Sequence, residues 1–256
     1  MSDRIPYTYI QFDIPLHPSQ LRKFRGAVIE SVAGLKAVFE AAGVASDLFH
    51  NHQEVLISDE ATSSDQPPLA DTHFRYPLIQ YKIRHRKAAI FGIGPGAQAL
   101  QLWMSLAGDS LSLGGEEVQL IMAAHTHGIW RPTIESKMTQ YRLNKWLPFN
   151  ASQFAHWKRT PKLSDRVVIL ERLIWGHLWQ TLDALEVAPD REKLQIHLST
   201  IDWMGFKDSY GIKRLALDVT LIANLNLPPE LSIGQGVSIG FGKLQPITSK
   251  QTDDPE

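Results

Sequence analysis

The sequence predicts an α+β protein, and the order of its local patterns supports this class. The first half of the 256-residue chain shows strand and helix patterns in the order strand, helix, strand, strand, helix, strand. This is the order of the ferredoxin-like (RRM-like) fold. The second half shows a strand, a long helix and two paired strands, which is the same order in a degenerate form. We therefore expect tandem ferredoxin-like domains over residues 1–125 and 126–250.

The elements of the first domain follow from local periodicity. The aromatic and β-branched run from Tyr7 to Ile14 predicts a strand. Apolar residues at every third or fourth position predict one helical stretch that opens at Pro18 and ends at Gly43. Further patterns predict strands over residues 76–84, 87–93 and 118–124 and a helix over residues 97–106.

The second domain shows a weaker version of the same order. Residues 141–149 are strand-like, and the clearest helix pattern of the chain runs from Asp165 to about Val187, with Ser164 as its N-cap. Residues 194–203 and 214–225 alternate like paired antiparallel strands joined by a turn over residues 205–211. A glycine-studded segment over residues 231–244 follows.

Composition excludes several protein classes. The chain has no cysteine, which excludes a disulfide scaffold and any cysteine-ligated metal. No stretch approaches ~18 uninterrupted apolar residues, and the first residues lack the pattern of a secretory signal, so we expect a soluble, cytoplasmic protein without a membrane partner. The net charge of −1 is not typical of an indiscriminate nucleic-acid binder, but seven bases and one acid fall within residues 131–162.

The polar, acidic stretch from Asp47 to Thr72 predicts a long exposed loop, and it carries the first candidate catalytic residues. His50 and His52 are two positions apart, so in an extended backbone both side chains project to the same side. Imidazoles exchange protons near neutral pH, and two of them can divide the removal of one proton and the delivery of another. The alternative is a pair of ordinary surface histidines, because ten histidines make chance pairs common.

A second pair, His125 and His127, stands at the end of a predicted strand with the same spacing. Such a pair can ligate a metal, but a metal site needs three or four ligands, and no Asp or Glu lies within several residues. A strand edge or a ligand-contacting surface is the competing interpretation. We expect no metal site and no cofactor.

Four glycines near the end of the chain precede a lysine. They are Gly234, Gly236, Gly240 and Gly242, followed by Lys243. Glycine lets backbone N–H groups approach a phosphate closely, and the lysine adds a cation. The alternative is a hairpin with bulges, since glycine also marks tight turns.

Basic residues alternate with aromatic residues in the segment 131–162. This mixture suits contacts with RNA phosphates and stacked bases, whereas a merely solvated face is the alternative. The candidate RNA-binding residues of this segment are Lys137, Arg142, Lys145, Lys158 and Arg159.

Together these motifs resemble a known family. The loop run LFHNHQ, the strand runs FRYPLIQYK and KAAIFGIGPGA, and the terminal GQGVSIGFGKL are similar to CRISPR repeat-processing endoribonucleases of the RAMP superfamily, over roughly residues 7–246. The resemblance implies metal-independent cleavage of CRISPR precursor RNA within its repeats. In that reaction the ribose 2′-hydroxyl attacks the adjacent phosphate and leaves a 2′,3′-cyclic phosphate and a 5′-hydroxyl.

The resemblance also implies roles for residues. His50 and His52 are the expected general base and general acid, without an assignment of which is which, and Lys36 on the first helix is a candidate third member. The glycine-rich segment, Lys243 and the region 131–162 would hold the CRISPR repeat RNA.

Two other functions fit the sequence. One is a non-catalytic RNA-binding RAMP subunit whose partners are the other subunits of a CRISPR effector complex. The other is a small metal-dependent hydrolase built on His125 and His127. Cleavage of the repeat RNA in the presence of EDTA would separate the expected nuclease from both.

Overall fold

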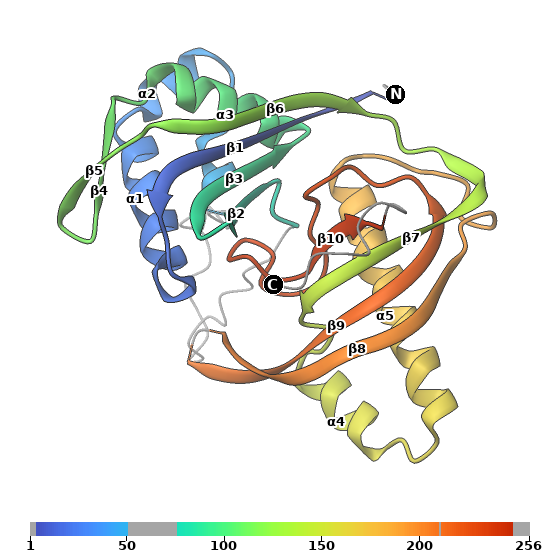
Figure 1. The fold of residues 1–256 in the computed structure, drawn as a ribbon. Helices are drawn as coiled ribbons and strands as arrows, with labels where there is room; N and C mark the ends of the chain where they lie inside the picture. The colour runs from blue at the N-terminus through green and yellow to red at the C-terminus, as the bar shows by residue number, and fades with distance from the viewer. Residues whose placement is uncertain (1–3, 51–75, 210, 248–256) are drawn as a thin grey trace, which may run out of the picture.

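The computed structural model describes residues 4–50, 76–209 and 211–247, and the two halves of the chain each form a four-stranded antiparallel sheet (Figure 1). In each sheet the first and third strands along the chain lie in the middle, flanked by the fourth and the second. This is the strand order of the ferredoxin-like fold, so the fold class predicted from the sequence is confirmed.

The N-terminal unit packs its helices on one face of its sheet. Its strands are β1 (Ile5–Pro15), β2 (Ile79–Arg84), β3 (Lys87–Ile93) and β6 (Met122–Trp130), and its main helices are α1 (Leu21–Ala33) and α3 (Pro95–Leu106). The strands lie in the order β2-β3-β1-β6. Phe12 of β1 contacts the rings of Phe24 in α1 and Trp103 in α3, and Tyr81 of β2 meets Phe24 edge-on. These buried rings fasten the helices to the sheet.

The C-terminal unit repeats the strand arrangement, but the connection between its last two strands contains no helix. Its strands are β7 (Ile134–Trp146), β8 (Ile196–Ser209), β9 (Ile212–Leu225) and β10 (Lys243–Pro246), in the order β10-β7-β9-β8. The long helix α5 (Leu163–Ala184) buries Leu170, Ile174, Leu178 and Leu182, which are four residues apart and form one apolar stripe. Between β9 and β10, residues 226–242 form a glycine-rich segment without a helix.

The first helix differs from the prediction because it is interrupted. The expected single stretch consists of a 3-10 turn η1 (Pro18–Gln20), α1, and a separate helix α2 (Lys36–Ala41). The break falls at Gly34, a residue with a high entropic cost in a helix interior. The predicted end at Gly43 is confirmed, since this glycine has a φ of +65°.

The hairpin of β8 and β9 is longer than predicted. The expected turn over residues 205–211 is wrong, because Gly205 lies inside β8 and the two strands pair as far as Ser209 and Ile212. Gly205 is needed within the strand, since a Cβ atom there would overlap the ring of Trp203. The turn itself uses Gly211, with a φ of +74°.

The strand predicted over residues 118–124 is divided between the end of β5 (Glu116–Gln119) and the start of β6. Four further elements were not expected: the 3-10 turn η2 (Ser46–Phe49), the strands β4 (Ser110–Leu113) and β10, and the helix α4 (Ala151–Arg159). Helix α4 starts at Asn150, which forms a reciprocal capping box with Gln153. Helix α5 begins after Lys162, so the predicted N-cap at Ser164 is wrong by two residues.

The connection between the two sheets is residues 131–133, and the domain boundary expected after residue 125 falls within β6. No helix in the described ranges combines the length and the apolar character that crossing a bilayer requires.

Candidate functional site

His50 lies directly after η2, at a point where the backbone is fixed but the side chain faces solvent. Phe49 before it is fully buried and contacts the rings of Phe39 and Trp103. The carbonyl of His50 accepts a hydrogen bond of 2.6 Å from Nη2 of Arg25 in α1. His50 itself is exposed. The buried ring of Phe49 and the bond from Arg25 therefore anchor the backbone at His50, and the residue lies at the surface.

The geometry of the predicted histidine pair is only partly described, because His52 lies outside the described residues. At His50 the backbone is helical, with φ −90° and ψ −28°, since the turn of η2 continues into it and its N–H donates to the carbonyl of Asp47 at 2.9 Å. The expectation of an extended backbone is therefore wrong at His50. The pairing of the two imidazoles stays a prediction.

Lys36, the third candidate for catalysis, is the first residue of α2, and α2 packs next to η2. Its ammonium lies 4.0 Å from the carboxylate of Glu40, and both side chains are two-thirds exposed. An ion pair this exposed contributes little free energy. The ammonium of Lys36 is therefore accessible to a phosphate that approaches this side of the unit.

His125 and His127 project to the same side of the edge strand β6, as their spacing predicts. Both residues are exposed, and their ring centroids lie 5.8 Å apart. In the part of the chain that the structure describes, no third His, Asp or Glu joins them to form a group of three potential ligands. Among those residues the pair therefore supplies two ligands, whereas a metal site needs three or four.

The glycine-rich segment lies between the two units and touches both. All four of its glycines have positive φ values, between 69° and 96°. A Cβ atom at Gly234 would lie 2.6 Å from the ring of Trp146 in the C-terminal unit. Ile239 forms a parallel bridge to Tyr81 of β2 in the N-terminal unit. Glycine is thus required here for packing, and its role in binding RNA stays a prediction.

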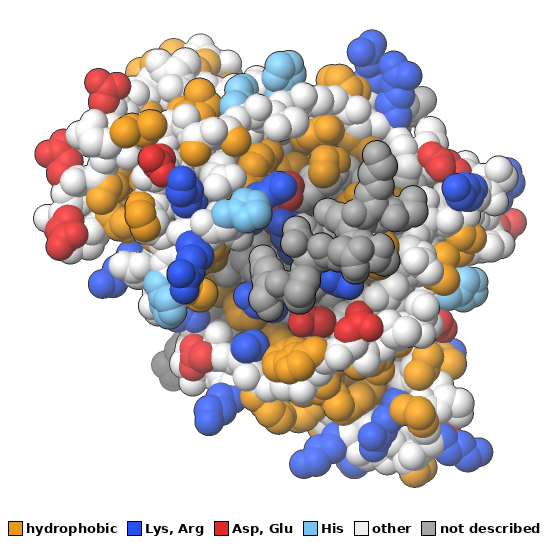
Figure 2. All heavy atoms as spheres, viewed as in Figure 1, with side chains coloured by type: hydrophobic (Ala, Val, Ile, Leu, Met, Phe, Trp, Pro, Cys, Tyr) orange, Lys and Arg blue, Asp and Glu red, His pale blue; other side chains and the backbone are white. Residues whose placement is uncertain are grey.

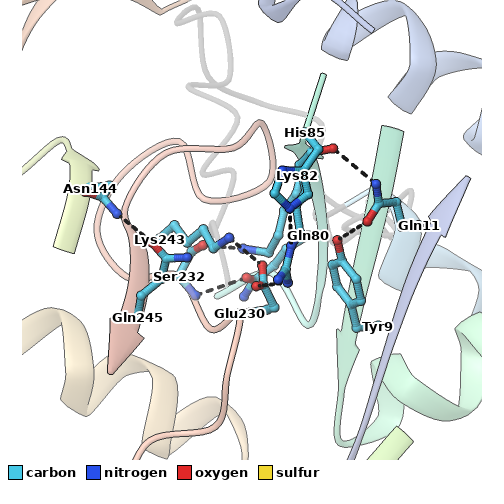
Figure 3. Close-up of polar contacts among 11 residues, drawn as sticks. Tyr9, Gln11, Gln80, Lys82, His85, Asn144, Glu230, Ser232, Lys243 and Gln245 are labelled. Carbon is cyan, nitrogen blue, oxygen red and sulfur yellow. Dashed lines mark hydrogen bonds and ion pairs between the residues drawn. The ribbon is translucent and has the colours of Figure 1, made fainter. Parts of the chain in front are cut away.

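A network of buried polar side chains holds this segment on β2 (Figure 3). Ser232 makes three hydrogen bonds across the boundary: its N–H donates to Gln80 Oε1 at 3.1 Å, its carbonyl accepts from the Tyr76 hydroxyl at 2.6 Å, and its Oγ bonds with Lys82 Nζ at 2.5 Å. Gln80, Lys82 and Ser232 are all buried. We call this set, together with Glu230, Arg84 and Lys243, the interdomain network.

Glu230 supplies a carboxylate to the interdomain network. Its Oε1 lies 2.9 Å from Nη1 of Arg84, and its Oε2 lies 2.9 Å from Nζ of Lys243. The side chain of Glu230 is 9% exposed and that of Lys243 is 19% exposed. Lys243, a predicted RNA-binding residue, is therefore largely buried and ion-paired within the protein.

The pKa of Lys82 is lowered from 10.5 to about 7, and burial of the amine is the main cause. Among the smaller contributions, the carboxylate of Glu230 raises this pKa and the positive charge of Lys243 lowers it. The Lys82 amine therefore changes its charge near neutral pH.

A second charged surface lies on the C-terminal sheet. Leu143, Leu215 and Leu217 are buried in the core, so their neighbours along the strands point away from it. We call this outward side the open face, and it carries Arg142, Trp203, Lys207, Arg214 and Asp218. Figure 2 shows Lys and Arg side chains around the middle of the molecule, where the two units meet.

The structure brings some of the predicted RNA-binding bases together and separates others. Arg142 is exposed on the open face, and Lys145, three residues later, is also exposed and donates its N–H to Asp218 Oδ1 at 2.5 Å. The strand β10 pairs Gln245 with Arg142, which places Lys243 at the same end of β7. Arg214 bonds to Gln235 and so connects the open face to the glycine-rich segment.

The other predicted bases lie elsewhere. Lys137 is exposed near the start of β7, and Lys158 and Arg159 are exposed at the end of α4. Arg159 lines a pocket of about 560 Å³ together with His156 and Arg172. These three predicted bases therefore do not form one cluster with Arg142 and Lys145.

Sequence reasoning missed the interdomain network and Trp203. Lys82 and Ser232 are 150 residues apart in the chain, and Arg84 and Glu230 are 146 apart, so no local spacing indicates their contact. The sequence places Trp203 at the end of a predicted strand. The structure shows a bulge before Trp203 and its ring next to Gly205, which no sequence pattern indicates.

Comparisons with known proteins agree with this architecture. Residues 66–127 match the family model of the Cas6b N-terminal domain, and residues 133–247 match that of the Cas6b C-terminal domain. No curated protein matches the sequence.

Solved structures share the fold. A crystal structure of Cas6b is 21% identical, with a TM-score of 0.72, over 95% of this chain and 100% of that chain. A crystal structure of the CRISPR RNA processing endoribonuclease Cas6b is 19% identical, with a TM-score of 0.65 and the same coverage. Csf5, a CRISPR-Cas type IV Cas6 crRNA endonuclease, is 14% identical over 96% of this chain and 100% of that chain, with a TM-score of 0.50.

Proposed function

Because this chain belongs to the Cas6b family, we propose that it is a metal-independent endoribonuclease that cleaves CRISPR precursor RNA within its repeats. Two solved proteins with the same fold are CRISPR RNA endonucleases. The observation that carries the proposal in this chain is the position of His50. It lies at the surface on an anchored backbone, directly after η2, and η2 packs against α2, the helix that Lys36 begins.

The proposed reaction is an internal transesterification. The 2′-hydroxyl of the nucleotide before the cleaved bond loses its proton and attacks the adjacent phosphorus, and the 5′-oxygen of the next nucleotide leaves with a proton. One of His50 and His52 takes the first proton and the other supplies the second. Lys36 stabilises the negative charge of the phosphorane. The products are a 2′,3′-cyclic phosphate and a 5′-hydroxyl.

The repeat RNA would bind where the two units meet. Arg142 and Lys145 supply exposed cations beside the glycine-rich segment, whose backbone N–H groups can approach phosphates closely. Lys137, Lys158 and Arg159 lie apart from this cluster and would contact other parts of the RNA. The two ion-paired cations of the interdomain network, Arg84 and Lys243, would add long-range attraction.

The test is cleavage of the repeat RNA by the purified full chain in EDTA. We expect cleavage at one position, with a product that keeps a cyclic phosphate and a product whose 5′ end accepts phosphate from a kinase. The matched control is the same RNA with a 2′-deoxynucleotide before the cleaved bond, which should bind and stay intact. Binding without cleavage of the unmodified RNA would contradict the proposal and favour a non-catalytic RNA-binding subunit. Cleavage that requires a divalent metal would contradict the proposed chemistry.

A further inference from the structure

Trp203 is an exposed tryptophan in the middle of a strand. Its residue is 38% exposed, whereas Trp103, Trp130 and Trp146 are buried in the cores of the two units. It lies on the open face, which is the side of the sheet nearest the glycine-rich segment through the contact of Arg214 with Gln235. A single exposed apolar residue is common on protein surfaces, so the case for a binding role depends on how this ring is supported and on the charges around it.

The ring of Trp203 is held in one orientation. The pairing of β8 with β9 is irregular between Ile201 and Trp203, where Asp202 forms a bulge. The bulge is fixed by the hydroxyls of Thr200 and Thr220, which donate to the Asp202 carboxylate at 2.6 Å and 2.9 Å. Bulges of this kind redirect a side chain.

The strand backbone next to the ring of Trp203 carries no side chain. Two residues along the strand, Gly205 has no side chain, and a Cβ atom there would overlap the six-membered part of the Trp203 ring. The six-membered part of the indole therefore lies next to the backbone of β8 at Gly205. A ring supported by backbone on one side loses less rotational freedom when a ligand binds, which favours stacking.

The charges around the ring suit a polyanion. Lys207 Nζ lies 4.9 Å from the ring centroid of Trp203, and Arg214 is the cross-strand partner of Lys207. Among the described residues, neither Lys207 nor Arg142 has an ion-pair partner. The carboxylates of this face are already engaged: Asp202 by two hydroxyls and Asp218 by the N–H of Lys145. These hydrogen bonds leave both carboxylates charged, but the bases Arg142, Lys207 and Arg214 outnumber them, so the net charge of the open face is positive.

We propose that Trp203 is a stacking platform for one unpaired base of the bound RNA, with Lys207 on the phosphate next to that base. Aromatic rings with adjacent cations bind single-stranded RNA in this way, because every base offers a π-face. The proposal rests on the proposed function, since it assigns a place on this chain to part of the same RNA. It adds a base-contacting residue outside the loop of His50.

The neighbouring residue Phe206 provides a matched control. It is 59% exposed and lies on the same strand, but it points to the other side of the sheet, where its ring meets Phe154 of α4 at 90°. Its removal deletes a similar exposed aromatic surface without touching the open face. A loss of RNA affinity from general disturbance of β8 would appear in Phe206→Ala as well.

The experiment measures equilibrium binding of repeat RNA that is protected from cleavage by a 2′-deoxynucleotide. We expect Trp203→Ala to weaken binding by roughly 5- to 150-fold, which is the range for one stacked base. Trp203→Phe should keep most of the affinity. Gly205→Ala, which forces the ring to move, should weaken binding although the ring is still present. Phe206→Ala should stay within about twofold of the wild type.

Two further readouts separate stacking from other roles. The dependence of affinity on salt should be unchanged in Trp203→Ala, because no cation is lost, and reduced in Lys207→Met. The loss in Trp203→Ala should disappear with a fully double-stranded RNA, whose bases are already stacked. Thermal unfolding of each variant shows whether it is folded. If Trp203→Ala does not fold, the separate variants Trp203→Phe and Gly205→Ala test the stacking platform in its place.

Each outcome has one meaning. If wild type binds the RNA and the folded Trp203 and Gly205 variants bind it equally well, the platform is wrong and the proposed function is unaffected. If wild type does not bind the RNA, this result contradicts the proposed function itself, whatever the Trp203 variants do. If Trp203→Ala changes the mass of the protein in light scattering but not its RNA affinity, the ring serves contact between copies of the chain, and the proposal is overturned.

Discussion

Lys82 and Ser232 form a hydrogen bond of 2.5 Å between the two units, with both side chains buried. The bond fastens the segment that precedes the glycines to the middle of β2. Buried polar contacts of this kind fix one arrangement, because any other arrangement leaves a charged group without a partner. The position of the glycine-rich segment relative to the N-terminal unit is therefore set by the interdomain network and not only by the connection at residues 131–133.

Removing the hydroxyl of Ser232 should destabilise the protein. We expect Ser232→Ala to lower the free energy of unfolding by about 1–3 kcal/mol, because the buried amine of Lys82 loses its hydrogen-bond partner. Urea unfolding measures this change. The control is Ser105→Ala, whose exposed hydroxyl bonds only to the carbonyl of Leu102 in its own helix. Equal effects of the two substitutions would show that the contact between the units contributes nothing.

The buried Lys82 should make stability depend on pH. Its pKa is lowered to about 7 in the folded protein, whereas an unfolded lysine has its usual value of 10.5. Between these values the unfolded chain binds more protons, so the free energy of unfolding rises as the pH rises above 7. Below 7 the amine is protonated in both states and this contribution is flat.

Comparison with Lys82→Met isolates this dependence. We expect the difference in unfolding free energy between wild type and variant to shift in favour of wild type as the pH goes from 7 to 9. Chemical unfolding at three or four pH values in that range measures it. A difference that does not change with pH would contradict a buried amine that loses its proton near neutrality.

The fold was predictable because it depends on local signals. Strand alternation and helix periodicity are properties of neighbouring residues, so the sheet strands and main helices of the N-terminal unit, the long helix α5 and the end of the first helical stretch at Gly43 follow from the sequence alone. The strand β10 does not, because its segment shows mainly glycines. Helix α4 has a local signal too, the capping box of Asn150 and Gln153, which the alternation of basic and aromatic residues in this segment obscures. The interruption at Gly34 is not predictable in this way, because Gly26 lies within the same pattern and α1 continues through it.

The site was predictable only in part. The family resemblance pointed to His50, but no sequence rule gives the helical backbone at that residue or its bond to Arg25. The sequence suggests that Lys243 is a free cation, and the fold instead brings Glu230 to it. Contacts of this kind depend on how the units pack, which spacing along the chain does not encode.

The glycine at position 242 should be irreplaceable by alanine. Its φ is +70°, and a Cβ atom would overlap the carbonyl group of Ile233, whose N–H bonds to Gly242 at 2.8 Å. We expect Gly242→Ala to lower the free energy of unfolding by about 1–3 kcal/mol or more. Gly108→Ala, with open space around the new atom and no positive φ, is the control. A loss of stability no larger than that of the control would mean that this turn is not strained by a side chain.

Arg142 and Lys145 should account for part of the salt dependence of RNA binding. We expect Arg142→Ala combined with Lys145→Asn to weaken binding and to lower the slope of log affinity against log salt by about 1.5, which corresponds to two phosphate contacts. Asparagine tolerates the positive φ of 49° at residue 145.

The control for this pair is Lys193→Ala, which removes an exposed lysine that is ion-paired with Asp190. We expect its salt slope to equal that of the wild type. An unchanged slope in the double variant would place the RNA away from β7 and β10.

The most direct test of the central claim is the single-turnover rate of repeat-RNA cleavage by His50→Ala in EDTA. We expect the rate to fall by about 10²-fold or more, as for the loss of a general acid or base, while RNA affinity stays close to that of the wild type. His17→Ala, which removes another exposed histidine from the same unit, should cleave at the wild-type rate. A His50→Ala rate equal to that of His17→Ala would contradict a proton-transfer role for His50 and, with it, the proposed site.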